Sequence, residues 1–203
     1  MSSEHYFSQE PSSSYHTSEI IINLGGEQLK VQTASGTFSP KELDLGTEVL
    51  LDRIDLAPKT GNILDLGCGW GPISIALAKH SPKATIWAVD VNSRSLEMTQ
   101  KNAASLGLEN IKTSDPDSFP QEISFTGIWS NPPIRVGKAE LHSMLLHWLP
   151  KLEKSGCAYL VVQKHLGSDS LIKWLDQNLG ENFEVSRLDS VKTYRIIKVL
   201  KRS

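Results

Sequence analysis

The chain has 203 residues, of which 39% are hydrophobic and 22% charged, and its formal net charge is −2. This is the composition of one globular domain with a sizeable core, and it excludes a general electrostatic attraction to nucleic acids or membranes. The sequence contains no apolar run of membrane-spanning length, no secretion signal, and only two cysteines, too few for a disulfide framework or a zinc site. We therefore expect a cytoplasmic protein that binds neither a membrane nor a metal.

The start of the chain is expected to be an arm followed by a hairpin. Its first residues are rich in serine and are typical of a loosely ordered arm. Ile20–Leu24 and Gln28–Thr33 have the composition of short strands, and the Gly-Gly pair between them is a hairpin turn signal. We expect residues 1–35 to form an extension of a domain that comprises residues 36–203.

Beyond the hairpin, helical and strand patterns alternate along the chain. Helices are expected at 44–54, 73–80, 93–106, 138–152 and 168–179, and strands at 63–66, 85–89, 111–113, 127–130, 158–162, 183–188 and 193–200. Strands separated by helices predict a mostly parallel sheet with helices on both faces. The last two strands are too close for a helical crossover, so at least one must run antiparallel. The sequence therefore predicts an α/β, Rossmann-like fold with a seven-stranded sheet and an antiparallel C-terminal strand.

A glycine-rich turn follows the first strand of this sheet, in NILDLGCGWG. Gly67, Gly69 and Gly71 suit a turn where the backbone approaches a ligand closely. A proline then begins a helix, so strand, turn and helix N-terminus form a nucleotide-sized cradle. The G-x-G-x-G spacing without Gly-Lys-Ser/Thr argues against a phosphate-binding loop, and Asp65 before the turn suits a cationic ligand. The structural alternative is a plain strand–helix turn.

Two acidic positions follow the next strands, at the edge where ligands of such sheets bind. Asp90 ends the second strand, 19 residues after Gly71, and its carboxylate can accept from both hydroxyls of a ribose. Its alternative role is to close the strand or cap the next helix. Asp115 follows the third strand and can accept from the amine of an adenine, with Asp117 as a rival. Either carboxylate can instead bond the backbone of the turn at Pro116.

The segment Asn131-Pro132-Pro133-Ile134 follows the fourth strand and is the most specific signal in the chain. The prolines restrict the backbone and hold the Asn side chain in place. An amide oxygen and a proline-restrained carbonyl can jointly accept from an NH2 group and leave its nitrogen lone pair free for attack. The alternative is an ordinary Asn-Pro turn.

These three features in this order resemble the class I S-adenosylmethionine-dependent methyltransferases, over about residues 36–200. The resemblance implies S-adenosyl-L-methionine as cofactor, with Asp65 and the glycine amides holding the ammonium and carboxylate of its methionine end. The cofactor contacts that it implies are Phe38, Thr47, Asp65, Gly67, Cys68, Gly69, Gly71, Asp90, Val91, Asp115 and Asn131. The residues it implies at the reacting amine are Asn131, Pro132, Pro133 and Ile134.

More narrowly, GTFSPKELDLGTEVLL, NPPIRVGK and TYRIIKVLKR are similar to the small-domain methyltransferases, which include ribosomal RNA guanine-N2 methyltransferases. Ile134 departs from the tyrosine usual in glutamine-modifying enzymes and from the aromatic residue common in adenine methyltransferases. Some guanine enzymes of this group contain two such domains, whereas this chain has one. The resemblance thus implies N-methylation of guanine N2 in 16S ribosomal RNA.

Other interpretations keep part of this chemistry. A methyltransferase could act instead on adenine N6, a protein glutamine or a small molecule, and a non-catalytic module could bind only the cofactor or RNA.

Three basic residues follow strand ends, namely Arg135, Lys138 and Lys164. They can meet RNA phosphates, or can simply be solvated charges.

Overall fold

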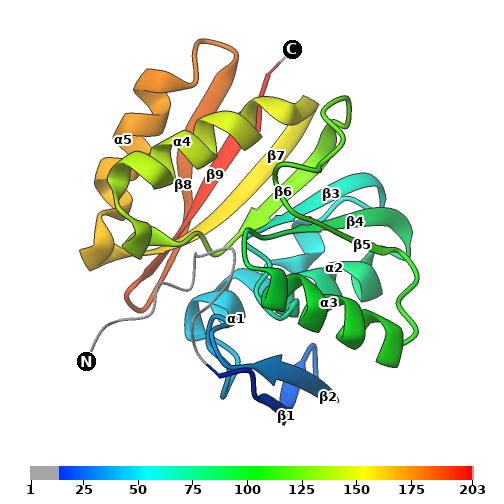
Figure 1. Cartoon of the computed structure of the whole chain (residues 1–203). Helices are drawn as coiled ribbons and strands as arrows, with labels where there is room; N and C mark the ends of the chain where they lie inside the picture. Colours follow the sequence, from blue (N-terminus) through cyan, green and yellow to red (C-terminus); the bar gives the residue numbers. More distant parts are fainter. Residues whose placement is uncertain (1–13, 203) are drawn as a thin grey trace.

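The computed structural model describes residues 14–202, and the expected N-terminal arm lies mostly outside these residues. Its centre is a seven-stranded sheet in the order β5-β4-β3-β6-β7-β9-β8 (Figure 1). The strands are β3 (Thr60–Leu66), β4 (Lys83–Val89), β5 (Ile111–Ser114), β6 (Phe125–Ser130), β7 (Leu152–Gln163), β8 (Phe183–Val191) and β9 (Tyr194–Lys201). Strand β9 runs antiparallel to both of its neighbours, and the other pairs are parallel. The predicted fold class is confirmed.

Helices cover both faces of the sheet. Helices α1 (Leu45–Leu51), α2 (Pro72–His80) and α3 (Ser93–Ser105) lie on one face, and α4 (Lys138–Trp148) and α5 (Ser168–Asn178) on the other (Figure 1). Successive strand residues point to opposite faces, so Ile63 packs in the core under α1 to α3, while Leu64 packs in the core under α4 and α5. Both strand residues are fully buried, which explains why the central strands are continuous apolar runs.

The predicted hairpin forms a separate two-stranded sheet, β1 (Thr17–Leu24) and β2 (Glu27–Ala34). Gly25 and Gly26 both have positive φ, 59° and 84°, as a tight two-residue hairpin turn requires. Asn102 of α3 joins the hairpin to the domain, because its side chain accepts from the backbone N–H of Gln32 at 2.7 Å and donates to the carbonyl of the same residue at 2.9 Å.

Some element boundaries differ from the prediction. Strand β7 begins six residues before the apolar run that predicted it, because Leu152 already pairs with Phe125 before the register of β6 and β7 shifts. Ser155 lies within this polar section with φ of 64°, a conformation that the strand pattern does not reveal. Helix α4 ends at Trp148, since Pro150 follows in a short 3-10 turn.

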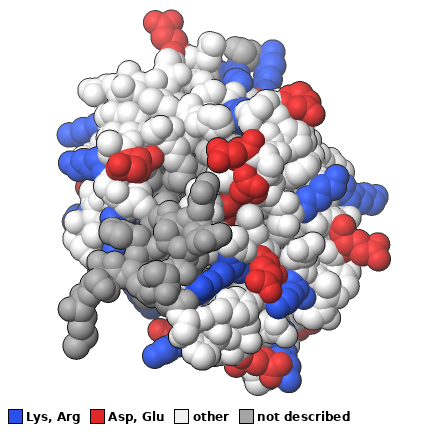
Figure 2. Space-filling view, viewed as in Figure 1, with Lys and Arg blue, Asp and Glu red and all other residues white. Residues whose placement is uncertain are grey.

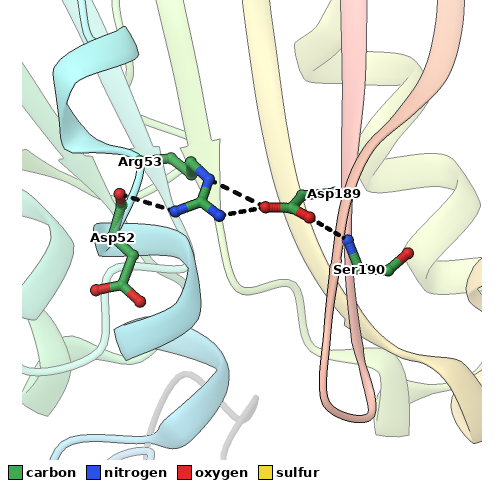
Figure 3. A network of polar contacts seen from close by, with 4 residues as sticks. All are labelled: Asp52, Arg53, Asp189 and Ser190. Carbon is green, nitrogen blue, oxygen red and sulfur yellow. Dashed lines mark hydrogen bonds and ion pairs between the residues drawn. The ribbon is translucent and has the colours of Figure 1, made fainter.

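An ion pair ties the segment after α1 to the edge of the sheet (Figure 3). The guanidinium of Arg53 donates through Nε and Nη2 to Oδ2 of Asp189 in β8, and through Nη1 to the carbonyl of Asp52. Oδ1 of Asp189 accepts from the backbone N–H of Ser190 at 2.6 Å. The hydrogen bonds from Arg53 lower the pKa of the Asp189 carboxyl. This pair helps to hold α1, whose N-terminus reaches the candidate site.

Among residues 14–202, no helix is long and apolar enough to cross a membrane, and no cluster of three or more His, Cys, Asp or Glu side chains suits a metal ion.

Candidate active site

Two neighbouring cavities open at the carboxyl ends of the parallel strands. The first has a volume of about 360 Å³ and lies between the loop before α1, the segment after β6, and the adjoining ends of β7 and β9. The second has a volume of about 380 Å³, is mostly apolar, and lies between the ends of β3 and β4 and helix α4. Gly67, Asp90 and Pro133 line both cavities, so a single elongated molecule can extend from one into the other.

The glycine turn between β3 and α2 provides space at this junction. Gly67 and Gly69 have φ of 76° and 58°. A Cβ atom on either would have no neighbour closer than 3.9 Å, from Pro133 and Phe38 respectively. Gly71 serves packing instead, because a Cβ there would lie 2.9 Å from Oγ1 of Thr99.

Three amides of this turn donate to acceptors within the protein. The N–H groups of Gly67 and Cys68 both donate to the carbonyl of Val89, at 2.8 and 3.1 Å, and that of Gly69 donates to Oδ2 of Asp90 at 2.9 Å. The expectation that the glycine amides of this turn help to hold the carboxylate of the cofactor stays a prediction. Cys68 is itself buried, and its Sγ lies 3.6 Å from Oγ1 of Thr99.

Asp65 is fully buried directly beneath the turn. Its Oδ2 accepts from the Ser74 hydroxyl at 2.6 Å, while Oδ1 has no hydrogen-bond partner among the described residues. Burial raises the pKa of this carboxyl to about 7. A buried acceptor without a partner requires an explanation. Asp65 does not itself line either cavity.

Asp90 follows β4 at the junction of the two cavities. Its Oδ2 accepts from Gly69 and its Oδ1 from the N–H of Asn92, both at 2.9 Å, and burial raises its pKa to about 6. Each carboxylate oxygen keeps further lone-pair capacity, so the group can also accept from two hydroxyls of a ligand. The neighbouring Val91 is 37% exposed and lines the second cavity.

Asp115 bonds its own turn, as the alternative derived from the sequence anticipated. Its Oδ1 accepts from the backbone N–H groups of Asp117 and Ser118 at 3.0 and 2.9 Å, and its Oδ2 accepts from the Ser118 hydroxyl. The hydrogen bonds from Ser118 lower the pKa of this carboxyl. From this turn Pro116 lines the second cavity, and neither aspartate does so.

Asn131 follows β6 and has its side-chain amide fixed from one side. Its Nδ2 donates to Oδ1 of Asp44 at 2.7 Å and to Oγ1 of Thr47 at 3.1 Å. A carboxylate can only accept, so the NH2 group must face Asp44 and the amide oxygen is left available as an acceptor. Asn131 and Asp44 both line the first cavity, whereas Thr47 is 2% exposed and supports the amide from behind.

The two prolines fix a second acceptor beside this amide. Pro133 has φ of −73° and ψ of 76°, the geometry of an inverse γ-turn, and the N–H of Ile134 donates to the carbonyl of Pro132 at 2.8 Å. A carbonyl oxygen has two lone pairs, so that of Pro132 can accept once more. All three residues line the first cavity.

Some of the remaining predicted residues line a cavity and others do not. Phe38 is 41% exposed, and Phe38 and Arg135 line the first cavity. Lys138 and Lys164 are exposed and line neither cavity. Sequence reasoning missed Asp44 as a site residue, although an aspartate three positions before Thr47 at the start of an apolar helix is a helix-capping signal.

Comparisons with known proteins identify the family of this chain. The family model described as methyltransferase small domain matches residues 28–198. The uncharacterized protein YbxB of Bacillus subtilis is 37% identical over 98% of this chain and 99% of its own length. Ribosomal RNA small subunit methyltransferase C of Shewanella baltica is 33% identical over 76% of this chain, but over only 45% of its own length. The chain thus spans about half the length of the ribosomal RNA methyltransferases that it matches.

A solved structure has the same fold. The 16S rRNA N2 methyltransferase RsmC of T. thermophilus, in complex with AdoMet and guanosine, superposes with a TM-score of 0.74 at 23% identity. The superposition covers 95% of this chain and 52% of that one. With the match of the family model, the chain belongs to the methyltransferase small domain family, and its cofactor is S-adenosyl-L-methionine.

Proposed function

We propose that this enzyme methylates the exocyclic N2 amine of a guanine in 16S ribosomal RNA. The observation that carries the proposal is the fixed amide of Asn131, which presents a neutral acceptor to the first cavity beside the carbonyl of Pro132. Two such acceptors suit the two hydrogens of a planar amine. Relatives named as ribosomal RNA small subunit methyltransferase C support the choice of substrate.

The cofactor fits the junction of the two cavities. We propose that its adenine occupies the apolar second cavity beside Val91, and that Asp90 accepts from its ribose hydroxyls. Gly67 and Gly69 leave room for the chain of its methionine end. Asp65 is the proposed partner of the ammonium, and because its carboxyl is buried and lines neither cavity, the turn must shift for a direct contact. For Asp115 to accept from the adenine amine, its carboxylate must do so in addition to bonding the turn.

The chemistry requires alignment more than acid or base catalysis. When bound, S-adenosylmethionine supplies a methyl group that is already electrophilic because its sulfur is a sulfonium. Asn131 and Pro132 hold the amine so that its lone pair points along the line of attack, and such positioning can contribute several powers of ten in rate. Bound S-adenosylmethionine would give its methyl group to the amine that these residues hold, and the methylated amine would release its proton to water.

We propose that RNA affinity depends on few basic residues. Lys and Arg are interspersed with Asp and Glu over the described residues on the face drawn in Figure 2. Arg135 lines the first cavity, while Lys138 and Lys164 are exposed and lie two residues and one residue after a lining residue. The chain spans about half the length of the ribosomal RNA methyltransferases that it matches. We propose that these three residues contact RNA phosphates.

The test is the variant Asn131→Ala, assayed with labelled S-adenosylmethionine and 16S rRNA from a strain that lacks the gene. We expect turnover to fall roughly 100-fold or more, because the amine is no longer aligned, while calorimetry shows cofactor affinity close to that of wild type. Asn178→Ala, on an exposed helix end, is the matched control. Unchanged turnover in Asn131→Ala would refute the role assigned here.

The product identifies the substrate class. N2-methylguanosine supports the proposal, whereas N6-methyladenosine, methylated glutamine in a protein, or a methylated small molecule would each replace it. Cofactor binding without any methylated product would indicate a non-catalytic module.

A further inference from the structure

Two polar side chains in the first cavity have no part in the reaction proposed above. Gln163 is the last residue of β7 and Tyr194 the first of β9, and the two are paired across these antiparallel strands. Nε2 of Gln163 donates to the hydroxyl oxygen of Tyr194 at 2.7 Å. Both residues line the cavity that Asn131 also lines, so the pair lies at the same edge of the sheet as the amine-binding amide.

Packing fixes the position of this pair relative to Asn131. The ring of Tyr194 is 7% exposed and lies against α1, where a Cβ on Gly46 would be only 2.8 Å from its Cε1. The amide of Asn131 is held by Asp44 and Thr47 at the same end of α1. One short helix therefore supports both the amine-binding group and the tyrosine.

The hydrogen bond between Gln163 and Tyr194 leaves an acceptor on the glutamine and a donor on the tyrosine available to a ligand. Because Nε2 of Gln163 donates to the tyrosine, its Oε1 remains an acceptor, and the hydroxyl of Tyr194 still has a proton to donate. An acceptor and a donor beside an amine-binding site match the edge of guanine, which carries N1–H next to the N2 amine and then the O6 acceptor.

We propose that Gln163 and Tyr194 select guanine: Oε1 of Gln163 accepts from N1–H, and the hydroxyl of Tyr194 donates to O6. This inference rests on the proposed function. Adenine bound through its N6 amine presents the N1 lone pair to the same oxygen, so two acceptors face each other. A site built around a hydrogen bond discriminates strongly against a ligand that leaves its polar groups unpaired.

The test combines kinetics on 16S rRNA from the deletion strain with calorimetric binding of guanosine and adenosine in the presence of S-adenosylhomocysteine. Gln163→Leu and Tyr194→Phe should each lower kcat/KM for N2 methylation by about 10- to 100-fold and reduce the preference for guanosine. Gln163→Glu keeps an acceptor oxygen for N1–H but cannot donate to the hydroxyl of Tyr194, so it should recover only part of the rate lost in Gln163→Leu.

Tyr159→Phe is the matched control, because this buried tyrosine of β7 loses the same hydroxyl but lines neither cavity. Cofactor affinity and melting temperature of the variants should stay close to wild type. The inference is overturned if Gln163→Leu keeps the wild-type kcat/KM and guanosine preference, or if wild type binds adenosine as well as guanosine. Wild-type protein that binds guanosine selectively but methylates no rRNA would instead reject the proposed ribosomal substrate.

Discussion

The amide of Asn131 is held in one orientation by Asp44, a residue 87 positions earlier in the chain. The same Oδ1 of Asp44 accepts from the backbone N–H of Thr47 at 3.1 Å and so caps helix α1. One carboxylate oxygen therefore links the start of a helix to the group that we propose to hold the reacting amine.

We expect Asp44→Ala to lose both functions of this oxygen. Turnover should fall about 10- to 100-fold because the Asn131 amide is free to rotate, and the free energy of unfolding should fall by about 1 kcal/mol with the loss of the cap. Steady-state kinetics and thermal unfolding measure the two effects. Asp44→Asn keeps an acceptor oxygen and should retain most activity, and Asp55→Ala, at an exposed position nearby, should change neither quantity. Wild-type kcat in Asp44→Ala would contradict this coupling.

Asp65 should make stability depend on pH. Its pKa is raised from 3.8 to about 7, so the folded state binds a proton that the unfolded chain has already released. Stability should therefore fall as pH rises from about 4 to about 7, by an amount on the order of 4 kcal/mol at most. Asp65→Asn removes this titration, so denaturant unfolding should show its stability relative to wild type increasing over the same pH range. A constant difference across that range would refute a raised pKa.

Asp90 should bind the ribose of the cofactor in addition to closing the glycine turn. We expect Asp90→Ala to weaken binding of S-adenosylhomocysteine by roughly 1–3 kcal/mol. A 2′-deoxy analogue separates the two roles in a double-mutant cycle. If Asp90 accepts from that hydroxyl, the analogue should lose affinity for wild type but little further affinity for Asp90→Ala. Additive losses in calorimetry would instead assign Asp90 to the turn alone.

Two glycines of the same turn should respond differently to alanine. Gly67→Ala places a methyl group at the junction of the cavities and should lower cofactor affinity more than stability. Gly71→Ala should mainly destabilise the fold, because its Cβ meets Thr99. Gly107, with φ of 67° and no atom near its Cβ position, is the control for backbone strain, which costs about 1–2 kcal/mol. Equal loss of cofactor affinity in Gly67→Ala and Gly71→Ala would contradict the distinction.

The sequence predicted the features that depend on local pattern. Apolar runs and turn residues were enough to anticipate the seven strands, their helices, and the position of Asn131 at a strand end. Local pattern could not show that Asp44 bonds Asn131, because that contact depends on how α1 packs against β7 and β9 of the sheet. It also could not show that the glycine amides bond Val89 and Asp90, since these bonds arise when β4 pairs with β3.

The most direct test of the central claim is nucleoside mass spectrometry of 16S rRNA from a strain that lacks this gene. We expect one N2-methylguanosine to be missing, the wild-type gene to restore it, and the gene encoding Asn131→Ala not to restore it. An unchanged set of modified nucleosides in the deletion strain, or restoration by the Asn131→Ala gene, would contradict it.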